Sequence, residues 1–158
     1  MKPEFSLEHL NAFILKAKAA SYVGDGENAE SCRPGSHDLI FEEVPFFYLD
    51  SYFGGSDFIG QEVVYYKGKP VWAMNYYGRI LEPALITAAE TGGVIKKSLS
   101  KMYAGEHRFL GGFEHTADDL YYTDTSQGEL SSFTGKEWIS RDTKKVYELD
   151  YHGGLIKE

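Results

Sequence analysis

The chain has a single cysteine, Cys32, among its 158 residues. An internal disulfide is therefore excluded, and the scarcity of cysteine indicates a reducing compartment. Long apolar runs are also missing, because no segment has the roughly 18 apolar residues that a membrane-spanning helix needs. The N-terminal sequence MKPEFSLEHL contains no apolar stretch of the kind found in a secretory signal. We therefore expect a cytoplasmic protein with no membrane partner.

Positive charge is scarce as well. The chain has 16 Lys and Arg residues against 24 Asp and Glu residues, which gives a formal net charge of −8. Its densest basic cluster, formed by Lys96, Lys97 and Lys101, is small and fits a solvated helix face. An acidic chain without a basic stripe repels a phosphate backbone, so we expect no direct binding to nucleic acid.

Motifs for catalysis or cofactor binding are also missing. The sequence has no Gly-X-Ser-X-Gly elbow and no dinucleotide fingerprint. No spacing of His, Cys and carboxylate residues matches a zinc or iron site. The glycine-rich segment from Asp50 to Asp57 could hold a ligand or a cation, but it lacks the regular acidic spacing of a calcium loop, and we favour a tight hairpin turn. We therefore expect neither a metal nor a cofactor, and the sequence assigns no catalytic residue.

Aromatic residues are abundant and make up 15% of the chain. Two segments of the sequence also resemble each other. Residues 58–78 read FIGQEVVYYKGKPVWAMNYYG, and residues 133–153 read FTGKEWISRDTKKVYELDYHG. At a constant offset of 75 residues, the identical pairs are Phe58/Phe133, Gly60/Gly135, Glu62/Glu137, Lys69/Lys144, Val71/Val146, Tyr76/Tyr151 and Gly78/Gly153. With a gap, residues 48–50 (Tyr-Leu-Asp) also resemble residues 122–124 (Tyr-Thr-Asp). A duplicated unit predicts a pseudo-symmetric fold with a pocket at its seam, and the alternative is two ordinary hairpins that converged in chemistry.

Periodicity predicts the order helix, strands, helix pair, strands. Apolar residues recur at helical spacing over residues 7–20, where Ser6 can act as the N-cap, and residues 21–36 read as a loop. Pro83 fits the first turn of a helix that Gly92 and Gly93 end, and residues 94–104 form a second helix. The predicted strands cover residues 38–44, 46–53, 58–66, 69–77, 109–116, 120–124, 129–133, 137–140 and 146–151.

This order indicates an α+β fold, an antiparallel sheet with an N-terminal helix and a central helix pair. We expect one domain over residues 1–158, built from two pseudo-repeats of helix plus strands, with halves at about 7–78 and 83–154.

Strand alternation assigns the matched residues to two faces. One face is predicted as core and carries large side chains: Trp72, Met74, Tyr76, Tyr147, Leu149 and Tyr151. The other face has polar side chains near a strand-ending glycine, namely Asn75, Tyr77, Asp150 and His152. These four residues can line one cleft if a pseudo-twofold axis relates the halves. The alternative is that they face solvent or satisfy loop backbone.

Glu62 and its counterpart Glu137 lie in otherwise apolar strands. A carboxylate in such a place is costly unless it is paired or hydrogen-bonded. Glu62 is therefore either a polar anchor or general base in an apolar pocket, or one partner of a structural salt bridge. For Glu137 we favour the salt bridge.

The phrases RPGSHDL, DSYFGGSDFIGQEVV, VWAMNYYGR, RFLGGFEH and LDYHGG together resemble a bacterial domain family of unknown function. The resemblance spans residues 13–155. Some members of that family lie C-terminal to an Xre-type helix-turn-helix DNA-binding domain, so the resemblance implies a regulatory or sensing module. It brings no established catalytic residues. Only a few residues precede the first predicted helix here, so we expect no DNA-binding headpiece.

These observations favour a non-enzymatic small-molecule-binding or sensing module with an aromatic-lined cleft between the pseudo-repeats. Its predicted ligand-binding residues are Glu62, Trp72, Asn75, Tyr77, Asp150 and His152. The first alternative is a small hydrolase or isomerase with Glu62 or His152 as general base. The second is a protein-interaction domain that uses exposed, aromatic-rich edge strands, and a free sheet edge also makes a homodimer plausible.

Overall fold

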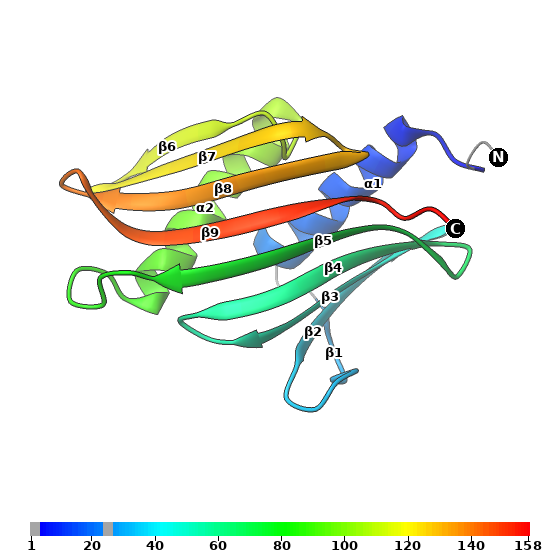
Figure 1. Ribbon diagram of the computed structural model, residues 1–158, viewed down its shortest axis with the longest axis horizontal. Helices are drawn as coiled ribbons and strands as arrows, with labels where there is room; N and C mark the ends of the chain where they lie inside the picture. The colour runs from blue at the N-terminus through cyan, green and yellow to red at the C-terminus, as the bar shows by residue number, and fades with distance from the viewer. Residues whose placement is uncertain (1–3, 24–26) are drawn as a thin grey trace.

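An antiparallel β-sheet dominates the fold, and two α-helices pack on one of its faces (Figure 1). The computed structural model describes residues 4–23 and 27–158. Within these residues the sheet has nine strands in the order β1-β2-β3-β4-β5-β9-β8-β7-β6. The strands are β1 (Glu27–Ala29), β2 (His37–Glu43), β3 (Phe46–Gly54), β4 (Phe58–Tyr66), β5 (Lys69–Ile80), β6 (Phe113–Ala117), β7 (Leu120–Glu129), β8 (Ser132–Arg141) and β9 (Lys144–Leu155). The predicted α+β class and antiparallel sheet are confirmed.

Strands β5 and β9 form the centre of the sheet, and each closes a run of strands that follow one another in the chain. They pair antiparallel, with Tyr76 opposite Tyr151. Two residues that match at the sequence offset of 75 are therefore direct cross-strand neighbours. Figure 1 shows these two strands side by side in green and red. Side chains from both halves of the sheet meet at this central pair.

Helix α1 (Leu7–Lys18) confirms the predicted N-terminal helix, and Ser6 caps it by accepting a hydrogen bond from the backbone N–H of His9. The predicted loop over residues 21–36 is wrong in part. A π-helix, η1 (Ala19–Val23), continues α1, and β1 lies within the same stretch, while residues 24–26 lie outside the described residues. Propensity does not reveal a π-helical turn, because such turns depend on what the helix packs against.

The predicted central helix pair is also wrong, because one helix, α2 (Ala88–Glu106), occupies that region. It begins at a capping box in which Thr87 and Glu90 bond to each other's backbone N–H groups, several residues after Pro83. Gly92 and Gly93 lie inside it. Each interior glycine costs about 1 kcal/mol relative to alanine. The buried residues of α2 lie on both sides of the glycines and outweigh that cost: Thr91, Val94, Ser98, Leu99, Met102 and Tyr103.

The second half of the sheet has fewer and longer strands than predicted. The segments expected at 120–124, 129–133, 137–140 and 146–151 merge into β7, β8 and β9, and β6 begins only at Phe113. Polar residues interrupt the apolar alternation there, but ladder hydrogen bonds do not depend on side-chain polarity. The hairpin turns have positive φ angles at Lys67, Gly68, Asp142 and Thr143. Such angles are typical of tight turns that match the twist of the strands.

The helices divide the covered face between them. Helix α1 contacts β2 and β3, helix α2 contacts β6 and β7, and η1 touches both helices. Figure 1 shows both helices behind the sheet, with the opposite face free of helices. Within the described part of the chain, neither helix is both long and apolar enough to cross a membrane. The hydrophobic core lies between the helices and the sheet. It includes the residues that strand alternation predicted as core, namely Trp72, Met74, Tyr76, Tyr147, Leu149 and Tyr151.

Candidate functional site

A cavity of about 540 Å³ lies between the covered face of the sheet and the two helices. Its exposed lining residues are in the turn between β3 and β4 and in the first half of α2, and they mark its mouth: Gly54, Gly55, Ser56, Ala88, Gly92 and Lys96. Apolar side chains make up much of its wall: Leu39, Phe58, Met74, Ile95, Leu99, Phe109 and Leu149. Its polar lining comes from both halves of the sheet and from both helices.

On the β5 side of the floor, Tyr76 lies over Gly60 and reaches Asp50. Its hydroxyl donates a 2.6 Å hydrogen bond to Oδ1 of Asp50, which is buried. A Cβ atom on Gly60 would lie only 2.5 Å from the Tyr76 hydroxyl oxygen. Glycine is therefore required at this position if the tyrosine is to lie flat across the neighbouring strand.

The same arrangement recurs on the β9 side. Tyr151 lies over Gly135, and its hydroxyl donates a 2.7 Å hydrogen bond to Oδ1 of Asp124. A Cβ atom on Gly135 would overlap the Tyr151 ring. The two matched glycines of the sequence thus have a physical function, which is to make room for the two matched tyrosines.

Glu62 is fully buried and has two strong partners. The ammonium group of Lys18, at the end of α1, lies 2.8 Å from one carboxylate oxygen, and the hydroxyl of Tyr48 donates to the other. Lys18 also lies over the ring of Phe109, 4.8 Å from its centroid. Of the two interpretations of Glu62, the salt bridge is the one that the structure contains. The pair joins the helix layer to the sheet.

Glu137 has the matching position but different partners. It is 6% exposed and accepts hydrogen bonds from the hydroxyls of Tyr122 and Tyr147, the latter at 3.2 Å. The salt bridge predicted for Glu137 is not found among the described residues. Burial and, to a smaller extent, the nearby charge of Asp124 raise the pKa of Glu137 to about 7, although the tyrosine hydrogen bonds and the charge of Lys18 act in the opposite direction. Its charge is thus not fully compensated.

Asp124 is the cross-strand neighbour of Glu137. Burial raises the pKa of Asp124 to about 6, although the hydrogen bond from Tyr151 and the charge of Lys18 act in the opposite direction. Both carboxyls line the cavity. Two adjacent acids that titrate near neutral pH can accept a positive charge or exchange protons with a bound molecule.

The hydroxyl group of Tyr103 remains protonated at neutral pH. Burial raises the pKa of Tyr103, which lines the cavity from α2, well above its usual value, and the carboxylates nearby add to the shift. Ser21, in η1, is 8% exposed and also lines the cavity. Its Oγ has no hydrogen-bond partner within the described part of the chain. The Oγ atom itself is buried, and a buried hydroxyl without a partner is costly.

Two of the six predicted ligand-binding residues, Glu62 and Trp72, lie on the covered face. Trp72 is fully buried and donates its indole N–H to the carbonyl oxygen of Leu130 at 3.1 Å. Neither Glu62 nor Trp72 belongs to the lining of the cavity. Glu62 forms an ion pair with Lys18, which does line the cavity, and Trp72 is a core residue.

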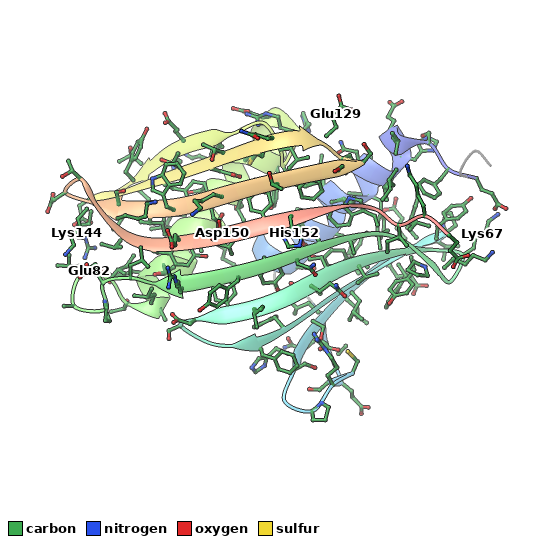
Figure 2. The ribbon with its side chains drawn as sticks, viewed as in Figure 1. Lys67, Glu82, Glu129, Lys144, Asp150 and His152 are labelled. Atoms are coloured by element: carbon green, nitrogen blue, oxygen red, sulfur yellow. The ribbon has the colours of Figure 1, made fainter. Side chains whose placement is uncertain are left out.

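The other four predicted residues lie on the open face, at the centre of the sheet. Asn75 is opposite His152, with 3.2 Å between the amide nitrogen and Nε2, and Tyr77 is opposite Asp150. Figure 2 shows Asp150 and His152 on the side of the sheet that faces the viewer, with the helices behind. The six residues therefore do not surround one cleft. Glu62 and His152, the two bases of the enzyme alternative, lie on opposite faces.

The predicted ligand-binding residues include none of these polar groups at the cavity: Lys18, Ser21, Asp50, Tyr103 and Asp124. A signal for the two aspartates existed in the resemblance between residues 48–50 and 122–124, next to the matched glycines and tyrosines. No local signal marks Lys18 or Ser21, because only packing brings the end of α1 to the sheet. Within residues 4–23 and 27–158, no group of three or more His, Cys, Asp or Glu residues is arranged to hold a metal ion.

Comparison with known proteins yields one family. The model of a family described as Domain of unknown function (DUF5680) matches residues 50–156, which is more than half of the chain. No curated protein and no solved structure gives a significant match.

Proposed function

We propose that this chain, which belongs to the DUF5680 family of domains of unknown function, is a small-molecule-binding module whose ligand occupies the cavity under the helices. The observation that carries the proposal is the combination of free volume with buried polar groups. Ligand sites are commonly about 300–1,000 Å³, mostly apolar, with a few polar groups that fix orientation. The cavity has about this volume, and its carboxyl and hydroxyl groups are held by neighbouring strands.

We further propose that the two halves of the sheet are pseudo-repeats and that the cavity is their seam. The support is that matched residues have matched contacts. Tyr76 and Tyr151 pair across the central strands, and each reaches an aspartate over a glycine. A sensing role, in which ligand occupancy is read by a regulatory partner in a bacterial cytoplasm, stays a prediction from the resemblance.

A second candidate function is favoured by one observation, the adjacency of Asp124 and Glu137. Their pKa values of about 6 and about 7 suit a general acid and base working near neutral pH. In this alternative the pair replaces Glu62, which is engaged by Lys18, and His152, which is on the other face. A bound compound recovered chemically unchanged after prolonged incubation would favour the binding module, whereas a converted compound would favour the enzyme.

The proposal is tested by narrowing the mouth of the cavity. Gly92 lines the mouth and Gly93 does not, although both lie in α2, are exposed and have open space where a Cβ would sit. We expect a compound library to contain ligands that raise the melting temperature, and we expect Gly92→Leu to weaken their effect. Gly93→Leu, the matched control, keeps it. The proposal is wrong if no compound stabilises the protein, or if the two variants respond alike.

A further inference from the structure

The two carboxyls that line the β7–β8 side of the cavity lack a cationic partner. Within the described residues, neither Asp124 nor Glu137 has an ammonium or guanidinium group at ion-pair distance. Their hydrogen-bond donors are tyrosine hydroxyls. Glu62, at the matched position in the other half, has Lys18 at 2.8 Å. The carboxyl in the β4 half therefore has a cation next to it, whereas the two carboxyls in the β7–β8 half have none at ion-pair distance.

The other charged groups near this acidic pair are already engaged. Lys18 of α1 holds Glu62, and Arg108, which follows α2, bonds to Glu106 and to the carbonyl oxygen of Leu110 at 2.6 Å. The remaining titratable groups that face the pair are tyrosines from β7, β9 and α2: Tyr122, Tyr147, Tyr151 and Tyr103. Burial raises the pKa of each of them, so they stay neutral and supply no positive charge.

Ser21 adds a polar residue to the cavity lining on the helix side. It is more than nine-tenths buried and lines the cavity, and its Oγ has no partner in the described part of the chain. Ser21 belongs to η1, a π-helical turn. Such turns are frequent at functional sites because they redirect a side chain out of the regular helical spacing.

We infer that the cavity takes a small organic cation, an amine carried on an apolar or aromatic body, whose N–H groups donate to Asp124 and Glu137. The body packs on the apolar wall, where Phe109 and Tyr103 present aromatic surface. This inference rests on the proposed function and specifies the ligand class of the same cavity.

A cationic ligand has a consequence for protons. It favours the ionised carboxylates, so its binding releases the protons that Asp124 and Glu137 hold when the cavity contains no cation. Both carboxyls have raised pKa values, about 6 and about 7, so the release is largest at and below neutral pH. Affinity for the cation therefore rises from pH 5.5 to pH 8.

The test uses three probes of matched shape and different charge: 4-phenylbutylamine, 4-phenylbutanol and 4-phenylbutyrate. Binding is measured by calorimetry at pH 5.5 and pH 8 in two non-amine buffers of different ionisation enthalpy. The difference in binding enthalpy between the two buffers gives the number of protons released. We expect the amine to bind best, to bind more tightly at pH 8, and to release protons. A charge-assisted hydrogen bond corresponds to about a tenfold to hundredfold preference over the alcohol.

Substitutions at the two carboxyls test whether they are the groups that bind the amine. Asp124→Asn and Glu137→Gln remove the two charges separately, and each is expected to weaken amine binding about tenfold or more while leaving alcohol binding unchanged. Asp150→Asn, on the open face, is the matched control and is expected to have no effect. Having two separate variants keeps the test informative if one of them does not fold.

Three results would overturn the inference: equal binding of amine and alcohol, tighter binding of the carboxylate, or amine binding that neither variant weakens. If the alcohol or the carboxylate binds and Gly92→Leu blocks it, the cavity is a ligand site and only the cation assignment is wrong. If neither the probes nor the library stabilises the protein, the proposed function fails as well.

Discussion

At the scale of single residues, Glu62 and Glu137 show how partners decide what a carboxylate does. Both occupy matched positions, are buried and accept a hydrogen bond from a matched tyrosine. Glu62 also has the ammonium group of Lys18, whereas Glu137 has only a second tyrosine. Desolvation then dominates at Glu137 and raises its pKa. The first glutamate is held in an ion pair, whereas the second has only neutral hydroxyl partners.

This difference predicts a pH dependence of stability that depends on Glu137. Its pKa of about 7 in the folded protein lies above its ordinary value of 4.5, so the native state holds the proton more tightly than the unfolded state. Its contribution to the free energy of unfolding is therefore full below pH 4.5 and is lost as the pH rises through about 7. We expect wild type to lose on the order of 3 kcal/mol more than Glu137→Gln between pH 4.5 and pH 8.

Urea denaturation across this pH range measures the effect. Glu129→Gln is the control, because Glu129 is exposed at the end of β7 (Figure 2). Parallel pH profiles for wild type and Glu137→Gln would contradict the assignment.

At the scale of elements, glycine has opposite effects in α2 and in the sheet. In α2, a Cβ atom on Gly93 would contact nothing within 4 Å, so the glycine only adds flexibility. In β8, Gly135 provides the space that the Tyr151 ring occupies. One residue type thus weakens a helix at one position and permits a close contact at another.

Alanine substitution separates these two uses. Gly93→Ala is expected to stabilise the protein by about 1 kcal/mol, since alanine has the better helix propensity. That change corresponds to a rise of about 2–4 °C in melting temperature for a chain of this size. Gly135→Ala is expected to lower the melting temperature, because the new methyl group displaces Tyr151 from Asp124. Stabilisation by Gly135→Ala would mean that the tyrosine can move without loss.

At the scale of the whole molecule, one buried ion pair connects the two layers. Lys18 ends the first helix and Glu62 lies in β4, and their side chains are 3% and 0% exposed. Removing one partner leaves an uncompensated buried charge, which costs about 3–5 kcal/mol. We expect Lys18→Met to destabilise the protein by that amount and Lys18→Met/Glu62→Gln to recover part of it.

Equilibrium unfolding of the single and double variants provides the test. Lys16→Met is the control, because Lys16 also lies in α1 but its ion pair with Glu43 is exposed. A double variant no more stable than the single one would show that Glu62 tolerates the loss of its cation.

The outer strands β1 and β6 are the free edges of the described sheet, and association of two chains through them stays a prediction.

Features that depend on near neighbours in the chain follow from the amino-acid pattern alone. The N-terminal helix with its Ser6 cap follows from residues three and four apart, and the alternation of Trp72, Met74 and Tyr76 follows from residues two apart. The match at an offset of 75 also pointed to glycines and tyrosines that contact each other in both halves. Where the local pattern was weak, as at Gly92 and Gly93, the prediction of two helices was wrong.

Packing of the helices determines which face of the sheet is covered, and therefore which polar residues are buried. Asn75, Tyr77, Asp150 and His152 lie on the open face, although their spacing fits a cleft. Lys18 and Glu62 are separated by 44 residues, and only packing makes them partners. The pKa of a carboxyl depends on burial and on charges that arrive from other elements, so neither the cavity nor its acidic pair is encoded in any local stretch of the chain.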